Sequence, residues 1–172
     1  MHAHDIKIGG ILIPWDAAHS LSQSYEPITG RHLMRLADGS AVLQQSWAPK
    51  LRTSIRGEGR YPDQLAGVDW SASFEIQCAA PLALHSSGTA VTLPAARRTD
   101  WAPFSKALVD GVLVSTSLSI VVNAGTIGAV AGATSYLTYY FPKLTCFAVM
   151  PPSRGFNARG PDAGWELIAE ET

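Results

Sequence analysis

Charged residues are scarce in this sequence of 172 residues: Asp, Glu, Lys and Arg make up 16% of it, whereas roughly a quarter is usual in a globular domain. The two signs nearly cancel to a net charge of −1, so no basic surface for nucleic acid or for an anionic membrane is indicated. Because little charge is left to cover a surface, we expect other protein to cover part of it, in an oligomer or a larger assembly. A large apolar core is the alternative explanation.

Cysteine is also scarce. Cys78 and Cys146 are the two cysteines, and without a C-x-x-C pair they form neither a metal cage nor a redox motif. Each lies in an apolar, strand-like context, so we expect two reduced, buried thiols rather than a disulfide.

The N-terminus lacks a cationic stretch followed by an apolar run, so no secretory signal is predicted and synthesis in a cytoplasm is expected.

Long apolar runs and helical periodicity are missing as well. Residues 111–142 carry no charge, but serine, threonine, asparagine and glycine interrupt them before the roughly 18 apolar residues that a membrane-spanning helix needs. Apolar spacing of three and four residues is nowhere sustained, so we expect helices to be minor. The sequence instead alternates apolar and polar residues over short runs, which predicts strands.

These strands and the turns between them predict the fold. We expect a hairpin turn at Gly9-Gly10, a short helical turn within residues 62–69, a hairpin around Pro142-Lys143 and a closing strand over residues 165–171. The pattern predicts a single all-β domain over residues 1–172, a β-sandwich or barrel with little helix. Two segments interrupt it: a long loop excursion around residues 86–104, and a Gly/Ala-rich segment around residues 123–135 that is either a loop or a closely packed strand.

The glycine pair Gly57-Glu58-Gly59 resembles a phosphate-binding loop but lacks its context. A phosphate loop opens a helix, whereas an alternating strand-like segment precedes this pair and a proline, Pro62, follows it. We therefore interpret Gly57, Gly59, Pro62 and Asp69 as structural turn residues, on the expectation that the glycines permit positive φ.

No group of residues predicts catalysis. There is no G-x-S-x-G elbow, and the acids Glu58, Asp63, Asp69 and Glu75 show no pairing that fixes two carboxylates about one bond. His2 and His4 at the terminus form at best an adventitious metal site. We expect no enzyme activity, no catalytic residue, no cofactor and no functional metal.

One loop has the composition of a protein interface. Arg97, Arg98 and Trp101 lie close together in the loop excursion, and arginine and tryptophan are enriched at interfaces. A solvated loop with Trp101 folded back on its own core is the alternative.

Three stretches together resemble the distal tail proteins of long-tailed bacteriophages, the small β-rich proteins of the tail-tip baseplate. The first stretch comprises residues 8–14 (IGGILIP), 25–31 (YEPITGR) and 33–39 (LMRLADG). The second comprises residues 53–62 (TSIRGEGRYP) and 65–69 (LAGVD), and the third comprises residues 142–145 (PKLT) and 164–171 (GWELIAEE).

The resemblance implies a β-sandwich or barrel related to tail-tube subunits. Such a protein is a structural virion protein that forms a ring, usually a hexamer, between the tail tube and the tip hub proteins. It further implies that the loop from Arg97 to Phe104 and the uncharged segment 111–140 contact neighbouring subunits. No specific nucleic-acid binding and no membrane insertion are expected, and the genome can pass through the lumen. A tail-tube or tail-terminator subunit is the alternative within this class, and a soluble β-sandwich ligand-binding module is the alternative from another class.

Overall fold

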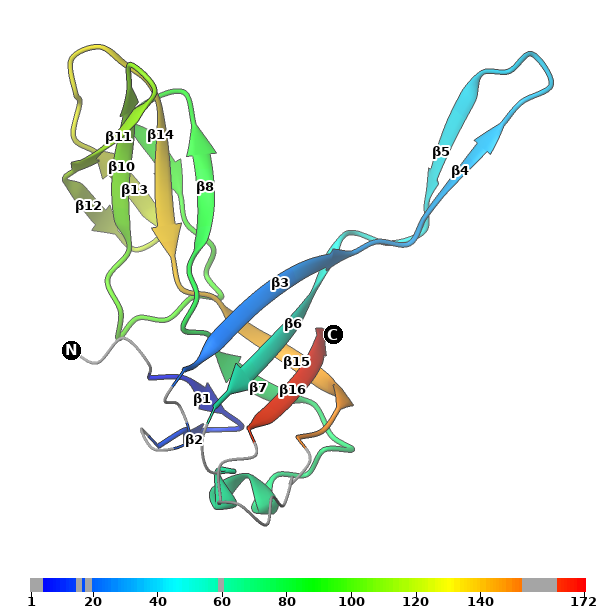
Figure 1. Cartoon of the computed structure of the whole chain (residues 1–172). Coiled ribbons are helices and arrows are strands. Elements are labelled where there is room, and N and C mark those ends of the chain that lie inside the picture. Colours follow the sequence, from blue (N-terminus) through cyan, green and yellow to red (C-terminus); the bar gives the residue numbers. More distant parts are fainter. Residues whose placement is uncertain (1–4, 15–16, 18–19, 59–60, 153–163) are drawn as a thin grey trace. The chain divides into compact units, whose positions relative to one another are not determined.

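The computed structural model describes residues 5–14, 17, 20–58, 61–152 and 164–172, and in these residues the protein is all-β (Figure 1). Its strands form several antiparallel sheets, and none of these sheets closes into a barrel. The short 3-10 helix η2 (Asp63–Gly67) confirms the helical turn expected before Asp69. No described helix is long and apolar enough to cross a membrane.

The chain folds into two compact units. Unit 1 comprises Met1–Lys7 and Ile76–Leu144, and unit 2 comprises Ile8–Glu75 and Thr145–Thr172. The chain passes between the units within three strands, β1 (Lys7–Ile8), β7 (Phe74–Gln77) and β15 (Lys143–Met150). Because each unit combines segments that are distant in sequence, no linker marks the division.

Unit 1 contains two small sheets. The four-stranded sheet has the order β11-β10-β14-β8, and the three-stranded sheet has the order β12-β13-β9. Ala107, Ile127 and Tyr136 are buried together in the core of this unit. The strands are β8 (Leu82–Ser86), β9 (Ala90–Thr92), β10 (Phe104–Val109), β11 (Val112–Thr116), β12 (Leu118–Val121), β13 (Ala124–Ile127) and β14 (Ala133–Tyr140).

The Gly/Ala-rich segment of unit 1 begins with strand β13, the closely packed alternative. Gly125 lies opposite Val91 of β9, and a Cβ at Gly125 would come within 2.8 Å of a Val91 methyl carbon. The segment is rich in small residues here because the neighbouring strand leaves no room for a side chain.

Most of unit 2 is a seven-stranded sheet with the order β2-β1-β7-β15-β16-β6-β3. The hairpin predicted at Gly9-Gly10 is confirmed, since both glycines have positive φ (57° and 80°) between β1 and β2. The remaining strands of this sheet are β2 (Ile11–Leu12), β3 (Ser22–Ile28), β6 (Lys50–Gly57) and β16 (Trp165–Glu171). The closing strand β16 has the predicted bounds.

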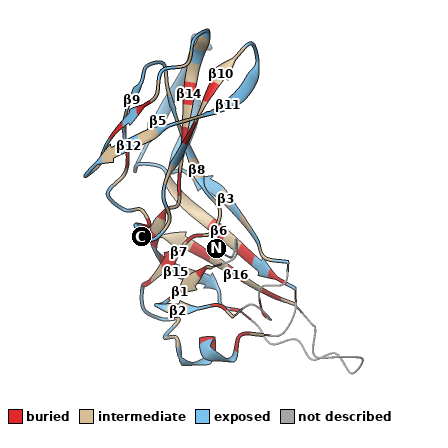
Figure 2. Ribbon diagram, turned by 90° about the vertical axis from the view of Figure 1, so that its left-hand side faces the viewer, coloured by how far each residue is buried: buried red, intermediate tan, exposed pale blue. Residues whose placement is uncertain are grey.

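Buried residues alternate with less buried ones along the central strands of this sheet (Figure 2), and the second face of these strands is charged. On β16 the buried residues Trp165, Leu167 and Ala169 alternate with half-buried residues. On the other face Arg52 of β6 forms ion pairs with Glu26 and Glu170, the residues opposite it on the two neighbouring strands. Such cross-strand pairs stabilise a register in which one face is solvated.

The hairpin expected around Pro142-Lys143 is wrong. Strand β14 pairs with β10 and β8 in the four-stranded sheet, whereas β15 pairs with β16 in the seven-stranded sheet. Pro142 has no N–H to donate to a ladder, and its carbonyl oxygen instead accepts a hydrogen bond from the N–H of Cys78 at 3.0 Å. The proline marks the passage of the chain from one sheet to another. Cys78 and Cys146 are both buried thiols, as expected.

Candidate functional site

The most distinctive surface feature of unit 2 is a two-stranded hairpin formed by β4 (Arg31–Arg35) and β5 (Ala41–Gln45), which continues from β3 and β6 (Figure 1). Residues 31–45 are called the arm from here on. The turn at its tip lies at Asp38-Gly39: Gly39 has a φ of 83°, and Asp38 Oδ1 accepts hydrogen bonds from the N–H and hydroxyl of Ser40. Every residue of the arm is exposed.

The arm exposes apolar side chains on both of its faces. Leu33 lies opposite Leu43 on one face, and Met34 lies opposite Val42 on the other. These four side chains are 59%, 55%, 41% and 40% exposed. Adjacent apolar residues are typical of strands that are covered on both faces, and an isolated two-stranded hairpin is only marginally stable in water. The arm therefore has the sequence pattern of a hairpin that is covered on both faces, although all of its residues are exposed in this structure.

A second exposed apolar element lies in unit 1. Strand β11 is an edge of the four-stranded sheet, and Val112, Leu113 and Val114 follow one another along it with exposures of 62%, 41% and 42%. The strand contains no charge and no proline, which are common devices that keep an edge strand from pairing with another chain.

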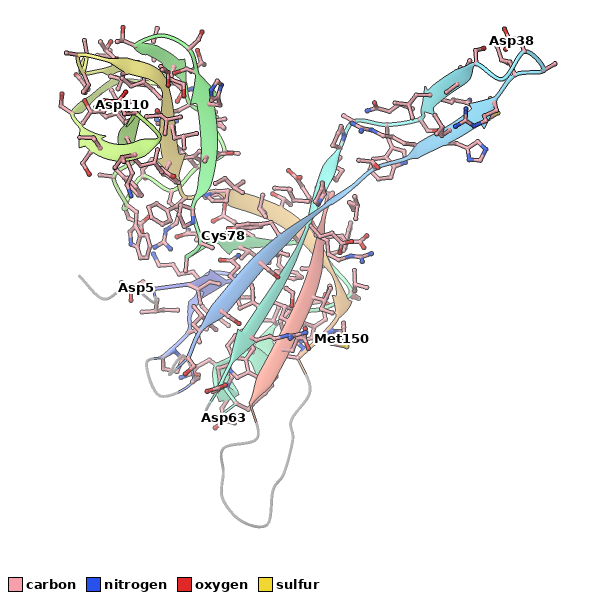
Figure 3. The ribbon with its side chains drawn as sticks, turned by 45° about the horizontal axis from the view of Figure 1, so that its top comes forward. Asp5, Asp38, Asp63, Cys78, Asp110 and Met150 are labelled. Atoms are coloured by element: carbon pink, nitrogen blue, oxygen red, sulfur yellow. The ribbon has the colours of Figure 1, made fainter. Side chains whose placement is uncertain are left out.

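The loop that sequence analysis selected as an interface is organised around Arg98. Its Nε and Nη2 donate to the two carboxylate oxygens of Asp100 at 3.0 and 2.7 Å, and Nη1 donates to the backbone carbonyls of Cys78 and Asp5. Asp5 and Cys78, the two residues that provide these carbonyls, are labelled in Figure 3. The guanidinium also lies 4.3 Å from the ring centroid of Trp101. One side chain thus connects three backbone segments of unit 1.

The contacts with Arg98 change the pKa of Asp100. The hydrogen bonds from Arg98 lower the pKa of the Asp100 carboxyl, and the charges of Arg98 and Lys7 act in the same direction. Lys7 Nζ lies 3.8 Å from the carboxylate.

These positions correct part of the interface prediction. The Arg98 side chain is buried, so it does not lie on an exposed loop. Trp101 packs edge-on against Phe141 with ring centroids 4.5 Å apart, which is the folded-back alternative, although its side chain stays partly exposed. Arg97 is half-buried and donates to the carbonyls of Pro94 and Val122.

Phe104 keeps the exposure that an interface residue needs. It is 40% exposed and stacks on Tyr139, the residue opposite it on β14, with ring centroids 4.8 Å apart. Its role in an interface remains a prediction.

Gly57, one of the predicted turn residues, has a different role from the one expected. Gly57 ends strand β6 opposite Trp165 and is not among the residues with positive φ. A Cβ there would lie 2.5 Å from both Trp165 Nε1 and the Ala17 carbonyl oxygen, so glycine is required by close packing rather than by a left-handed turn.

The other turn residues lie around η2. Pro62 is buried and its carbonyl accepts the N–H of Leu65, while Asp69 Oδ1 accepts hydrogen bonds from the N–H and hydroxyl of Ser71. Gly59 lies outside the described residues, as do the candidate metal ligands His2 and His4.

A hollow of about 690 Å³ is present in unit 2, beside the end of β6. Within the described part of the chain, no three His, Cys, Asp or Glu side chains gather in a way that could hold a metal ion. Residues that line the hollow are Ser20, Ser22, Arg56, Gly57, Glu58, Gly164, Trp165 and Glu166.

Comparison of the chain with protein-family models, with curated proteins and with solved structures found no match.

The exposed arm is the feature of this surface that sequence reasoning did not identify. The available signal was the adjacency of Leu33 to Met34 and of Val42 to Leu43, because a strand with one solvated face alternates apolar and polar residues.

Proposed function

We propose that this protein is a structural, non-enzymatic virion protein of a phage tail tip. In this proposal its copies assemble into a ring, such as a hexamer, that joins the tail tube to the baseplate or tip hub. The observation that carries the proposal is the arm, whose two strands expose Leu33 and Leu43 on one face and Met34 and Val42 on the other. A tail-tube or tail-terminator subunit is the alternative within the same class.

The size of the apolar surface indicates how such an assembly is held together. Burying a fully exposed Leu, Val or Met side chain contributes about 1.5–3 kcal/mol, so a half-exposed one contributes about 1 kcal/mol. The four apolar side chains of the arm then supply about 4 kcal/mol, and the three of β11 supply about 3 kcal/mol. Association costs about 4–15 kcal/mol in lost translational and rotational freedom. Neither surface alone is sufficient, so each subunit needs several contacts, as a closed ring provides.

The ligand-binding alternative has weaker support in the hollow of unit 2. Among the described residues Trp165 is the one aromatic residue that lines it, and this side chain is buried with its indole N–H donating to the Ala17 carbonyl at 2.8 Å. Arg56 and Glu166 line it as an ion pair with each other at 2.8 Å. These polar groups are already paired within the protein, and the described lining residues do not include the several converging aromatic side chains of many ligand sites.

The experiment that tests the proposal is mass in solution by light scattering over a range of concentrations, with negative-stain images of the same fractions. The expected result is a fixed stoichiometry above two, with ring-shaped particles that have a central hole. A monomer at every concentration, with the arm cut by trypsin at Arg31 or Arg35, would contradict self-assembly and favour the binding module.

A further inference from the structure

Both exposed apolar elements have open strand edges. The arm is a two-stranded sheet, so β4 and β5 each present unpaired backbone N–H and C=O groups along one side, and β11 does so at the edge of the four-stranded sheet. Strands with open edges bind other strands by continuing the sheet. We propose that β4 of one copy pairs with β11 of a second copy, an inference that rests on the proposed self-assembly and identifies the surfaces that carry it.

Edge pairing explains why both elements are apolar on both faces. Along β11, Val112 and Val114 point to one face of the sheet and Leu113 points to the other. Packing the arm flat against β11 would cover one of these faces. Pairing the edges instead gives every β11 side chain a second cross-strand neighbour besides the one on β10, on both faces at once. The same holds for Leu33 and Met34 of β4, which also point to opposite faces.

The charges favour a second copy as the partner and β4 as the pairing strand. Arg31 and Arg35 stand at the two ends of β4, whereas β5 carries no charge. Asp110 lies two residues before the start of β11, and no other charge follows it until after Pro142. Within the described part of the chain neither Arg31 nor Asp110 has an ion-pair partner. Because β4 has an arginine at each end, either strand orientation brings one of them close to Asp110.

The contact joins two different surfaces, so it is head-to-tail. A head-to-tail contact leaves one arm and one β11 edge free at the two ends of every open chain of subunits. Such chains end only by closing into a ring, or else they grow into filaments. The inference therefore deepens the proposed function, since it gives each subunit the two different surfaces from which a closed ring can be built.

The first test uses two full-length variants that are mixed under mild oxidation. One carries Leu33→Cys at the centre of β4, and the other carries Val114→Cys at the centre of β11. A disulfide forms only between residues whose Cα atoms are about 4.4–6.8 Å apart, and here it can form only between two chains. The native Cys78 and Cys146 are buried, and the unsubstituted protein is the blank. The matched control replaces Val114→Cys by Val121→Cys, which is 72% exposed on β12 of the same unit.

A disulfide dimer of Leu33→Cys with Val114→Cys, absent with Val121→Cys, is the expected result. Three other outcomes would overturn the inference. Cross-linking of Leu33→Cys to itself would show that arms pair with arms. Assembly by light scattering without the Leu33–Val114 disulfide would reject this contact while leaving the proposed function standing. A protein that stays monomeric at all concentrations would reject both.

A second test asks whether the arm drives assembly. Leu33→Glu is expected to raise the concentration for half-assembly at least about tenfold, because it places a charge at the centre of the pairing strand. Leu12→Glu is the matched control: Leu12 is 49% exposed on β2 of the same unit, and its substitution is expected to change the concentration less than about twofold. Equal effects of the two substitutions would contradict a specific role of the arm.

The proposed attraction between Asp110 and the arm arginines can be tested separately by the effect of salt on assembly. Salt should raise the concentration for half-assembly of the wild-type protein, because it screens the attraction between Asp110 and the arm arginines. Asp110→Asn keeps a residue that tolerates the φ of 49° at this position, and it should flatten the salt dependence. Adding Arg31→Gln and Arg35→Gln to Asp110→Asn should then have little further effect. Independent, additive effects would contradict the pairing.

Discussion

Arg98 offers the most direct test of how unit 1 is held together. Its buried guanidinium donates to the carbonyls of Asp5 and Cys78 and to both oxygens of Asp100, and it lies over the ring of Trp101. The peptide N–H of Arg98 donates in addition to the Phe141 carbonyl at 2.8 Å. Replacing the side chain by alanine keeps this last bond and removes all the others.

The cost of Arg98→Ala can be worked out from these contacts. Leaving the carbonyls of Asp5 and Cys78 without their donor costs about 1–3 kcal/mol each when they are buried. Losing the contact with the Trp101 ring costs about 1 kcal/mol. The pair with Asp100 contributes less than about 1 kcal/mol, because that carboxylate is 44% exposed and can be rehydrated. Recovered side-chain entropy of about 2 kcal/mol acts in the opposite direction. The net destabilisation is therefore about 3 kcal/mol.

The assay is urea unfolding followed by circular dichroism, at a protein concentration where the chain is monomeric. Arg98→Lys should lose about half as much stability, since an ammonium keeps the charge but cannot reproduce the planar donor fork. Arg35→Ala is the matched control, because its guanidinium donates only to the exposed Gly39 carbonyl; it should cost less than about 0.5 kcal/mol. A free energy of unfolding for Arg98→Ala within about 0.5 kcal/mol of the wild type would refute the reasoning.

Three further substitutions test local features of the fold. Gly57→Ala should destabilise the protein by about 2–3 kcal/mol in urea unfolding, because the new Cβ collides with the Trp165 indole, whereas Gly67→Ala, with open space around it, should be nearly neutral. Val122→Gly should raise stability by about 0.5 kcal/mol, since Val122 has a φ of 58° and is 81% exposed; a lower melting temperature would contradict this. The lowered pKa of Asp100 predicts stability that is fully present above pH 3.8 and declines as the pH falls below it. Asp100→Asn should show a shallower acid dependence, and parallel curves would argue against the prediction.

The features that sequence reasoning predicted well are local ones. The turn at Gly9-Gly10, the helical turn at η2 and the strand β16 each depend on residues within a few positions of one another, and each is confirmed. The alternating segment before Gly57 is strand β6, as expected, and its alternation places Arg52 and Arg56 on one face of the strand. The all-β class follows from many such local signals.

The features that sequence reasoning missed depend on which strands pair. Residues 136–141 and 144–150 have the pattern of a hairpin, and only the partners of β14 and β15 show that they belong to different sheets. The position of Arg98 is similar. Its composition and loop context favour an exposed interface, whereas its burial results from carbonyls at Asp5 and Cys78 that lie far from it in sequence. Pairing between distant segments leaves no trace in a local pattern.

Two explanations account for the low content of charged residues in the sequence: a large apolar core, or a surface that other protein covers. The strands that build the core of unit 2, such as β6 and β16, do carry charge, on the face that meets solvent. The long uncharged segment 111–142 instead contains β11, which is exposed over residues 112–115 without a charge to solvate it. The arm likewise exposes apolar residues on both faces. Charge is therefore missing from the exposed strands β5 and β11 rather than from the strands that build the core of unit 2, and the proposed assembly accounts for this distribution better than a large core does.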